Sequence, residues 1–161
     1  MTAQIAIAIT LLTAWVVAVW VGTGRLPASI SQSVFDLPPV GRVLWTVVIG
    51  AVAFLTVPSL IDKCSEQTRF LAFIACAGLA FVAAAPLVQD KNDIAYKVHM
   101  TGAWTCAIAS QLILVFNQPC ILFGWVPWLI AFVWITKDER WRTRTLWAEM
   151  TCFWLIFTFA L

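Results

Sequence analysis

The chain has 161 residues, of which 62% are hydrophobic and only 11% charged, with a formal net charge of +2 and a mean hydropathy of +0.91. No soluble domain can bury that much apolar surface, so the composition excludes a water-soluble globular protein. The small net charge, without a basic stripe, excludes nucleic acid as a partner. The length allows one domain, residues 1–161, whose main surrounding is the lipid bilayer.

Six apolar runs follow one another, and each is close to the 20 or so residues that a helix needs to cross a bilayer. They are Ala3–Gly22, Arg42–Ile61, Phe70–Val88, Val98–Phe116, Pro119–Thr136 and Thr145–Leu161. The first run has no Lys or Arg before it, which favours a retained span over a cleaved signal peptide. The last two runs are short for a span. The sequence therefore predicts an all-α, polytopic membrane helical bundle with six transmembrane helices.

Basic residues are distributed unevenly among the connections between the runs. The first, third and fifth connections, with Arg42 at an edge, carry eight Lys and Arg, half of them between residues 137 and 144. The second and fourth connections carry two, Lys63 and Arg69. By the positive-inside rule, the odd connections face the cytoplasm, and the N- and C-termini are non-cytoplasmic.

Small residues recur every four positions on two of the runs, at Ala72, Cys76, Ala80 and Ala84 and at Gly102, Cys106 and Ser110. Small side chains let helix backbones approach closely in a membrane. We expect these two helices to pack against each other, and the alternative use of such a stripe is a homo-oligomer.

Proline, tryptophan and cysteine predict further local features. Pro127 lies in the middle of the fifth run, where it should kink the helix. Tryptophans near the run ends are expected to anchor the protein at the membrane interface; these are Trp20, Trp45, Trp141 and Trp147. Cys64 and Cys120 lie on the same side, either as a disulfide or, as we favour, as free thiols. No cysteine–histidine cluster is present, so no metal or cofactor is expected.

Several polar residues lie at the end of the predicted bundle that carries the first, third and fifth connections. The first connection is too apolar for a free linker and is bracketed by prolines, so we expect a short re-entrant or interfacial segment over the bundle mouth. His99, the only histidine, and Glu149 lie about one turn inside their runs, where ionisable groups usually face an interior or a water-filled cavity. The candidate ligand-binding residues are Ser31, Asp36, Asp90, His99 and Glu149.

This mouth favours a non-catalytic function, the binding or passage of a small polar solute, an ion or a lipid headgroup. The second hypothesis is a membrane hydrolase or transferase acting on lipid, with Ser31 or Ser29 as nucleophile beside His99 and Asp90. It requires a serine or a metal within about 3 Å of His99.

Two further interpretations remain open. A structural or channel-forming oligomer would need a continuous polar stripe, to which Ser110, Gln111 and Thr151 contribute little. In a purely structural role, Glu149 would pair with Arg142 or Arg144, and His99 would cap a helix.

Four segments resemble an uncharacterised family of small six-helix membrane proteins of gut bacteria and their phages. They are Pro27-Ala28-Ser29-Ile30-Ser31, the run Phe70–Leu79, Ala85-Pro86 and Lys97-Val98-His99. The resemblance covers roughly residues 25–110 and implies a six-helix fold, a bacterial inner (cytoplasmic) membrane location and no established activity. More distantly, the chain resembles ceramidase-like membrane hydrolases. Those enzymes use several histidines as zinc ligands, whereas this chain has His99 alone.

Overall fold

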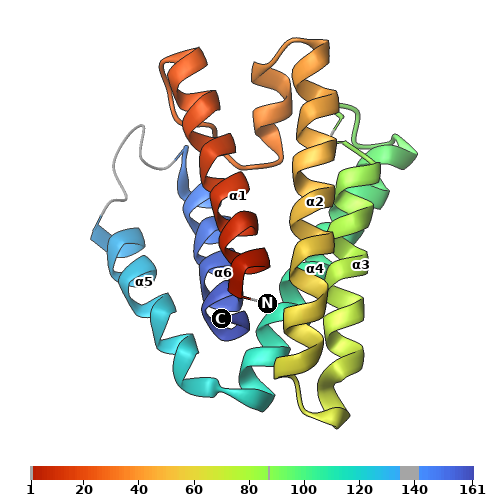
Figure 1. Ribbon diagram of the computed structural model, residues 1–161. Coiled ribbons are helices and arrows are strands. Elements are labelled where there is room, and N and C mark those ends of the chain that lie inside the picture. Colours follow the sequence, from red (N-terminus) through yellow and green to blue (C-terminus); the bar gives the residue numbers. More distant parts are fainter. Residues whose placement is uncertain (1, 87, 135–141) are drawn as a thin grey trace.

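The computed structural model describes residues 2–86, 88–134 and 142–161, and all regular secondary structure in these ranges is helical (Figure 1). Six are α-helices: α1 (Thr2–Thr23), α2 (Pro39–Lys63), α3 (Arg69–Ala84), α4 (Ile94–Asn117), α5 (Trp125–Trp134) and α6 (Arg144–Ala160). Three are short 3-10 helices: η1 (Gln32–Asp36), η2 (Glu66–Thr68) and η3 (Pro119–Gly124).

Four helical segments are long and apolar enough to cross a membrane. They are Thr2–Thr23, Pro39–Lys63, Glu66–Ala84, in which η2 continues into α3, and Ile94–Asn117. The predicted all-α fold is confirmed for the described residues, and the four long apolar helices support a membrane location. Six membrane crossings are not confirmed, because α5 has only 10 residues and α6 has 17.

The ends of the long helices follow from local chemistry. Gly24, with φ of +71°, follows the end of α1 and adopts the left-handed conformation that favours glycine. Pro39 occupies the first turn of α2, where its missing N–H leaves no hydrogen bond unmade. Asp93 caps α4, because its side chain accepts the Ala95 N–H at 2.7 Å.

The fifth predicted span differs most from expectation. Its first six residues form η3, and α5 begins only at Trp125. Pro127 therefore lies in the first turn of α5, where its N–H would have no helical partner in any case. The predicted mid-span kink at Pro127 is wrong, since the direction of the chain changes at the start of α5 instead. Residues 135 and 136 of that span lie outside the described residues.

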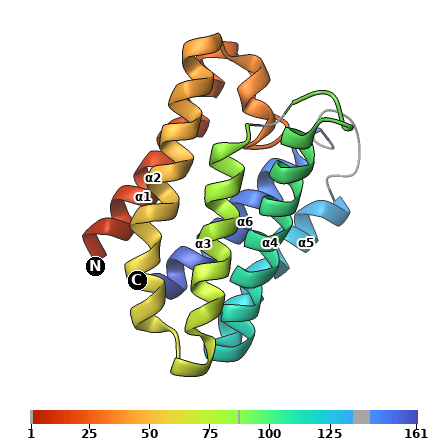
Figure 2. The ribbon, with the colours of Figure 1, turned by 90° about the vertical axis from the view of Figure 1, so that its right-hand side faces the viewer.

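Helices α1 to α4 pack in chain order, each against the next, and α6 packs against α1, α2 and α4. Helix α5 lies on the outer side of α6 (Figure 1). Figure 2 shows the first connection and the α3–α4 connection at the same end of the bundle, and the N- and C-termini close together farther down. All candidate site residues belong to the end with these two connections.

The closest helix pair is α3 and α4, as predicted from their small residues. A Cβ on Gly78 would lie 2.7 Å from the Cys106 nitrogen and 2.7 Å from the Gly102 oxygen. Two parts of the predicted α3 stripe are wrong, because Ala80 and Ala84 are exposed. The backbones instead approach at Gly78 and Gly102.

The outer surface of the long helices is strongly apolar. Phe54 of α2 is 77% exposed, and Trp104 of α4 is 63% exposed. Large exposed aromatic side chains on successive helices are unfavourable in water and match a hydrocarbon surrounding. The surface therefore agrees with a membrane location.

Candidate functional site

The first connection folds back into the helix bundle, in agreement with the expected segment over its mouth (Figure 1). Ile30 and Ser33 are buried in it. The Trp15 indole N–H donates to Ser33 Oγ at 2.9 Å, and the Trp45 indole N–H donates to the Ile30 carbonyl at 3.2 Å. These bonds satisfy polar groups that the segment carries below the bundle mouth, as burial requires.

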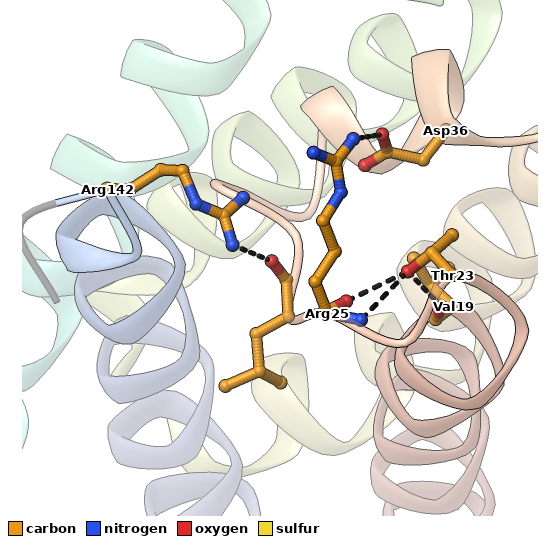
Figure 3. Close-up of polar contacts among 6 residues, drawn as sticks. Val19, Thr23, Arg25, Asp36 and Arg142 are labelled. Carbon is orange, nitrogen blue, oxygen red and sulfur yellow. Dashed lines mark hydrogen bonds and ion pairs between the residues drawn. The ribbon is translucent and has the colours of Figure 1, made fainter. Parts of the chain in front are cut away.

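Helix α6 holds the same segment from the other side. Glu149 Oε2 accepts the Ile30 N–H at 2.6 Å, and the Leu146 N–H donates to the Ala28 carbonyl at 3.0 Å. These two hydrogen bonds tie the backbone next to Ser31 to α6. Arg142, one of the expected partners of Glu149, donates instead to the Leu26 carbonyl at 2.9 Å (Figure 3).

His99 lies at the centre of the site and is only 1% exposed. Its Nδ1 is 2.8 Å from the carbonyl oxygen of Ala85, the residue that follows α3, and its Nε2 is 2.9 Å from Ser31 Oγ. A carbonyl oxygen only accepts, so Nδ1 carries the proton in neutral His99. Nε2 then accepts the hydrogen bond, and Ser31 donates it. The Trp45 ring stacks against the imidazole, with 6.0 Å between ring centroids.

The remaining two predicted site residues have local partners at the surface. Asp36 forms an ion pair with Arg25 at 2.8 Å (Figure 3). Asp90 accepts the Asn92 N–H at 2.9 Å within the connection before α4. The structure thus brings Ser31, His99 and Glu149 together around the first connection, and it places Asp36 and Asp90 in separate interactions.

A cavity lies below this segment and between four helices. Its volume is about 110 Å³. Most lining residues are apolar, and Ser31 and Glu149 lie at the end near the first connection; the full lining is Ile30, Ser31, Trp45, Ile49, Leu79, Val82, Ala103, Cys106, Ala107, Ser110, Glu149, Cys152, Phe153 and Ile156.

Exposure of the lining residues shows where the cavity opens. Those on α2 and α3 are buried, as are Ser110 and Ile156. The partly exposed ones lie on α4, as Ala103 and Ala107, on α6, as Cys152 and Phe153, and in the first connection, as Ser31. The opening therefore runs along α4 and α6 at the side of the bundle, with Ser31 at the end near the first connection.

A second polar cluster lies deeper, where α4, α5 and α6 meet. Gln111 Nε2 donates to Cys152 Sγ at 3.2 Å, and Gln111 Oε1 accepts the Trp125 indole N–H at 2.8 Å. Ser110 Oγ donates to the Ala107 carbonyl at 2.9 Å. These polar side chains are partnered within the protein, which ties α5 to the bundle.

Sequence reasoning missed Trp45. Its predicted interfacial position is wrong, because the side chain is 0% exposed and lies between Ile30 and His99. Trp20 and Trp147 are about half exposed, as interfacial anchors would be, and Trp141 lies outside the described residues. The fully buried position of Trp45 depends on the first connection folding over it, which no local pattern indicates.

All five cysteines lie in the described ranges and are free thiols, Cys64 and Cys120 included. Within those ranges, no three His, Cys, Asp or Glu side chains are grouped so as to hold a metal ion. The zinc-ligand set of the ceramidase-like hydrolases thus has no counterpart among these residues.

Comparison with protein-family models, with curated proteins and with solved structures finds no match for this chain. Fold and site define a class only: an α-helical protein with four helices long and apolar enough to cross a membrane and a first connection that folds over an apolar cavity. The resemblance to small six-helix membrane proteins stays a prediction.

Proposed function

We propose that this protein is a six-pass protein of a bacterial inner membrane that binds a lipid. The hydrocarbon chain of the lipid lies in the cavity between α2, α3, α4 and α6, and its polar head lies at Ser31 and Glu149. In this proposal, the ligand of the expected polar mouth is a lipid headgroup. Membership of the small six-helix family is part of the same proposal.

The cavity supports this function most directly. Its lining is mostly apolar, with Ser31 and Glu149 at the end near the first connection, as an amphiphile requires, and with the deeper Ser110 hydrogen-bonded to the Ala107 carbonyl. Its opening between α4 and α6 is lateral, so a lipid in the surrounding bilayer can enter without crossing water. A small ion or polar solute would need several polar ligands along the cavity, and this lining offers few.

A channel-forming oligomer has less support. Thr151, one of the residues that would form its polar stripe, donates its hydroxyl to the Trp147 carbonyl at 2.8 Å. Ser110 and Gln111 are likewise hydrogen-bonded to protein atoms. Side chains occupied in this way do not form a continuous polar path.

Photo-cross-linking tests the lipid site. The full chain is placed in phosphatidylethanolamine–phosphatidylglycerol vesicles that contain a phospholipid with a diazirine in its acyl chain. We expect cross-links on the α4 and α6 peptides that line the cavity. Ala107→Trp, which fills the cavity, should reduce these cross-links at least about tenfold, because it removes the space for the chain.

The matched control is Ala80→Trp, on the exposed face of α3 and outside the lining. It should leave the cavity cross-links unchanged. Equal cross-linking of the cavity peptides in the parent and in Ala107→Trp would contradict the proposal.

A further inference from the structure

Ser31 lies between a buried histidine and the cavity. Its Oγ is 2.9 Å from His99 Nε2, and the same residue lines the cavity and is only partly buried. The Ala85 carbonyl holds the proton of neutral His99 on Nδ1, which leaves the lone pair of Nε2 directed at the serine. A serine whose hydroxyl donates to a histidine that is oriented by a third group has the arrangement of an activated nucleophile.

Other nearby serines lack this arrangement. Ser29 is 4% exposed, and its Oγ accepts the Gln32 N–H at 2.9 Å. Ser33 is fully buried, and its hydroxyl is bonded to Ile30 and Trp15. Ser110 lines the same cavity but bonds the Ala107 carbonyl. Ser31 therefore combines a histidine partner with access to the cavity.

We propose that Ser31 is a nucleophile and His99 its general base, and that the pair cleaves the ester bond of a lipid whose acyl chain occupies the cavity. The choice of substrate rests on the proposed lipid-binding function. An acyl chain between α4 and α6 that extends toward the first connection brings its ester carbonyl to Ser31. Glu149 is a positioning residue, because its bond to the Ile30 N–H fixes the backbone beside the nucleophile.

The reaction is an acyl transfer in two halves. Ser31 Oγ forms a bond to the ester carbonyl carbon, and the hydroxyl proton passes to His99 Nε2. The bond between that carbon and the alcohol oxygen then breaks, and the leaving alcohol takes the proton from Nε2. Water repeats the sequence on the acyl-serine, with His99 taking and returning its proton, and releases the fatty acid and the free serine.

Two fluorophosphonate probes, one with a long alkyl chain and one with a short chain, test the pair on the full chain in detergent. We expect mass spectrometry to find the adduct on Ser31, with the long-chain probe reacting faster. Ser31→Ala should lose the adduct, and Ser65→Ala, an exposed serine outside the cavity lining, should keep it. His99→Asn should react at least about 100-fold more slowly, since a general base contributes that much or more.

We choose His99→Asn because this variant should keep the folded structure of the parent. Its side-chain amide can donate to the Ala85 carbonyl as Nδ1 does, so the fold-stabilising bond remains while the base is removed. Thermal unfolding of each variant checks this directly. A parent Ser31 that forms no adduct, or a His99→Asn variant that reacts at the parent rate, would overturn the proposal.

The two proposals fail differently. If neither probe labels Ser31 but the diazirine lipid still cross-links in the cavity, the nucleophile is wrong and lipid binding stands. If both probes label Ser31 at the same rate, and Ala107→Trp changes neither, the lipid cavity is wrong and the reactive serine stands.

Discussion

Trp45 joins the first connection to the helix bundle through both ends of its side chain. Its indole N–H reaches the Ile30 carbonyl, and its ring packs against His99. The Ile30 carbonyl also accepts from Ser33 Oγ at 2.5 Å, so it keeps one partner if the indole is removed. The contribution of Trp45 is therefore one hydrogen bond and part of the packing that orients the histidine.

Trp45→Phe should lower the free energy of unfolding by about 1–2 kcal/mol, because one buried hydrogen bond and some contact area are lost. Reversible unfolding in mixed micelles measures it. Trp147→Phe is the control, since that side chain is 51% exposed and its loss should change the free energy of unfolding little. Equal losses in the two variants would mean that the contacts of Trp45 contribute no more than a membrane anchor does.

Part of the site is predictable residue by residue. His99 and Glu149 stand out because they are ionisable groups near the ends of apolar runs, where burial forces them to find partners. Ser31, Asp36 and Asp90 lie in the connections at the same end of the bundle. The sequence does not show that Ser31 bonds His99, whereas Asp36 and Asp90 bind their neighbours. The atoms that orient the site are main-chain groups, the Ala85 carbonyl and the Ile30 N–H, and no sequence pattern marks them.

At the scale of helices, the α3–α4 contact depends on two glycines. The sequence predicts the pair of helices but places the contact on the wrong part of α3. A four-residue spacing advances about 40° beyond a full turn, so the step from Ala72 to Ala84 rotates about 120° around the helix. Ala72 faces the bundle for this reason, whereas Ala84 does not. Gly78, six residues after Ala72, is rotated about 120° in the opposite sense, and its backbone meets that of α4.

Gly78→Ala should destabilise the protein by about 1–3 kcal/mol, because the added carbon meets backbone atoms of α4 that cannot move aside alone. The matched control is Gly50→Ala in α2, where the nearest atom would be the Ala83 Cβ at 4.0 Å. That variant should be neutral or slightly stabilising, since alanine favours a helix over glycine. Unfolding of the two variants in the same micelles compares them. A Gly78→Ala variant as stable as the parent would show that α3 and α4 can move apart without loss of stability.

The first four helices could be predicted because each combines a long apolar run with its own start and stop residues. α4 begins at Ile94, before the predicted Val98, since Asp93 caps it a turn earlier. The fifth helix could not be predicted, because apolar content alone does not separate a 3-10 segment from an α-helix. Pro119 and Gly124 bound η3, and the side chain of Leu155 would have to shift to admit a Cβ at Gly124.

In the whole molecule, the order of the helices places the first and third connections at one end of the bundle, which is also the end that carries their basic residues. The first and third connections lie together at one end, and η3 lies at the other (Figure 1). Arg25 and Lys91 belong to the first of these ends. Lys137 and Arg140 of the fifth connection lie outside the described residues. The cytoplasmic location of the odd connections stays a prediction from their charge.

Cysteine labelling tests this orientation. Cys120 is exposed in η3, whereas Cys64 is 3% exposed just after α2. Burial raises the pKa of the Cys64 thiol, against the opposing effects of a hydrogen bond from Thr68 and the charge of Arg69. A raised pKa leaves less of the reactive thiolate at neutral pH, so Cys64 should react slowly, and faster as the pH rises. An impermeant maleimide added to intact spheroplasts should therefore label Cys120 and not Cys64.

Lys91→Cys in a Cys120→Ala background reports on the opposite end, because Lys91 is exposed in the α3–α4 connection. It should be labelled only after the membrane is permeabilised, since an odd number of crossings separates it from η3. If intact spheroplasts label Lys91→Cys, and the parent is not labelled at Cys120, the odd connections face outward and the predicted orientation is wrong. Labelling of both from outside would contradict the crossing of the membrane by α4, and the lateral lipid entry between α4 and α6 would then lose its basis.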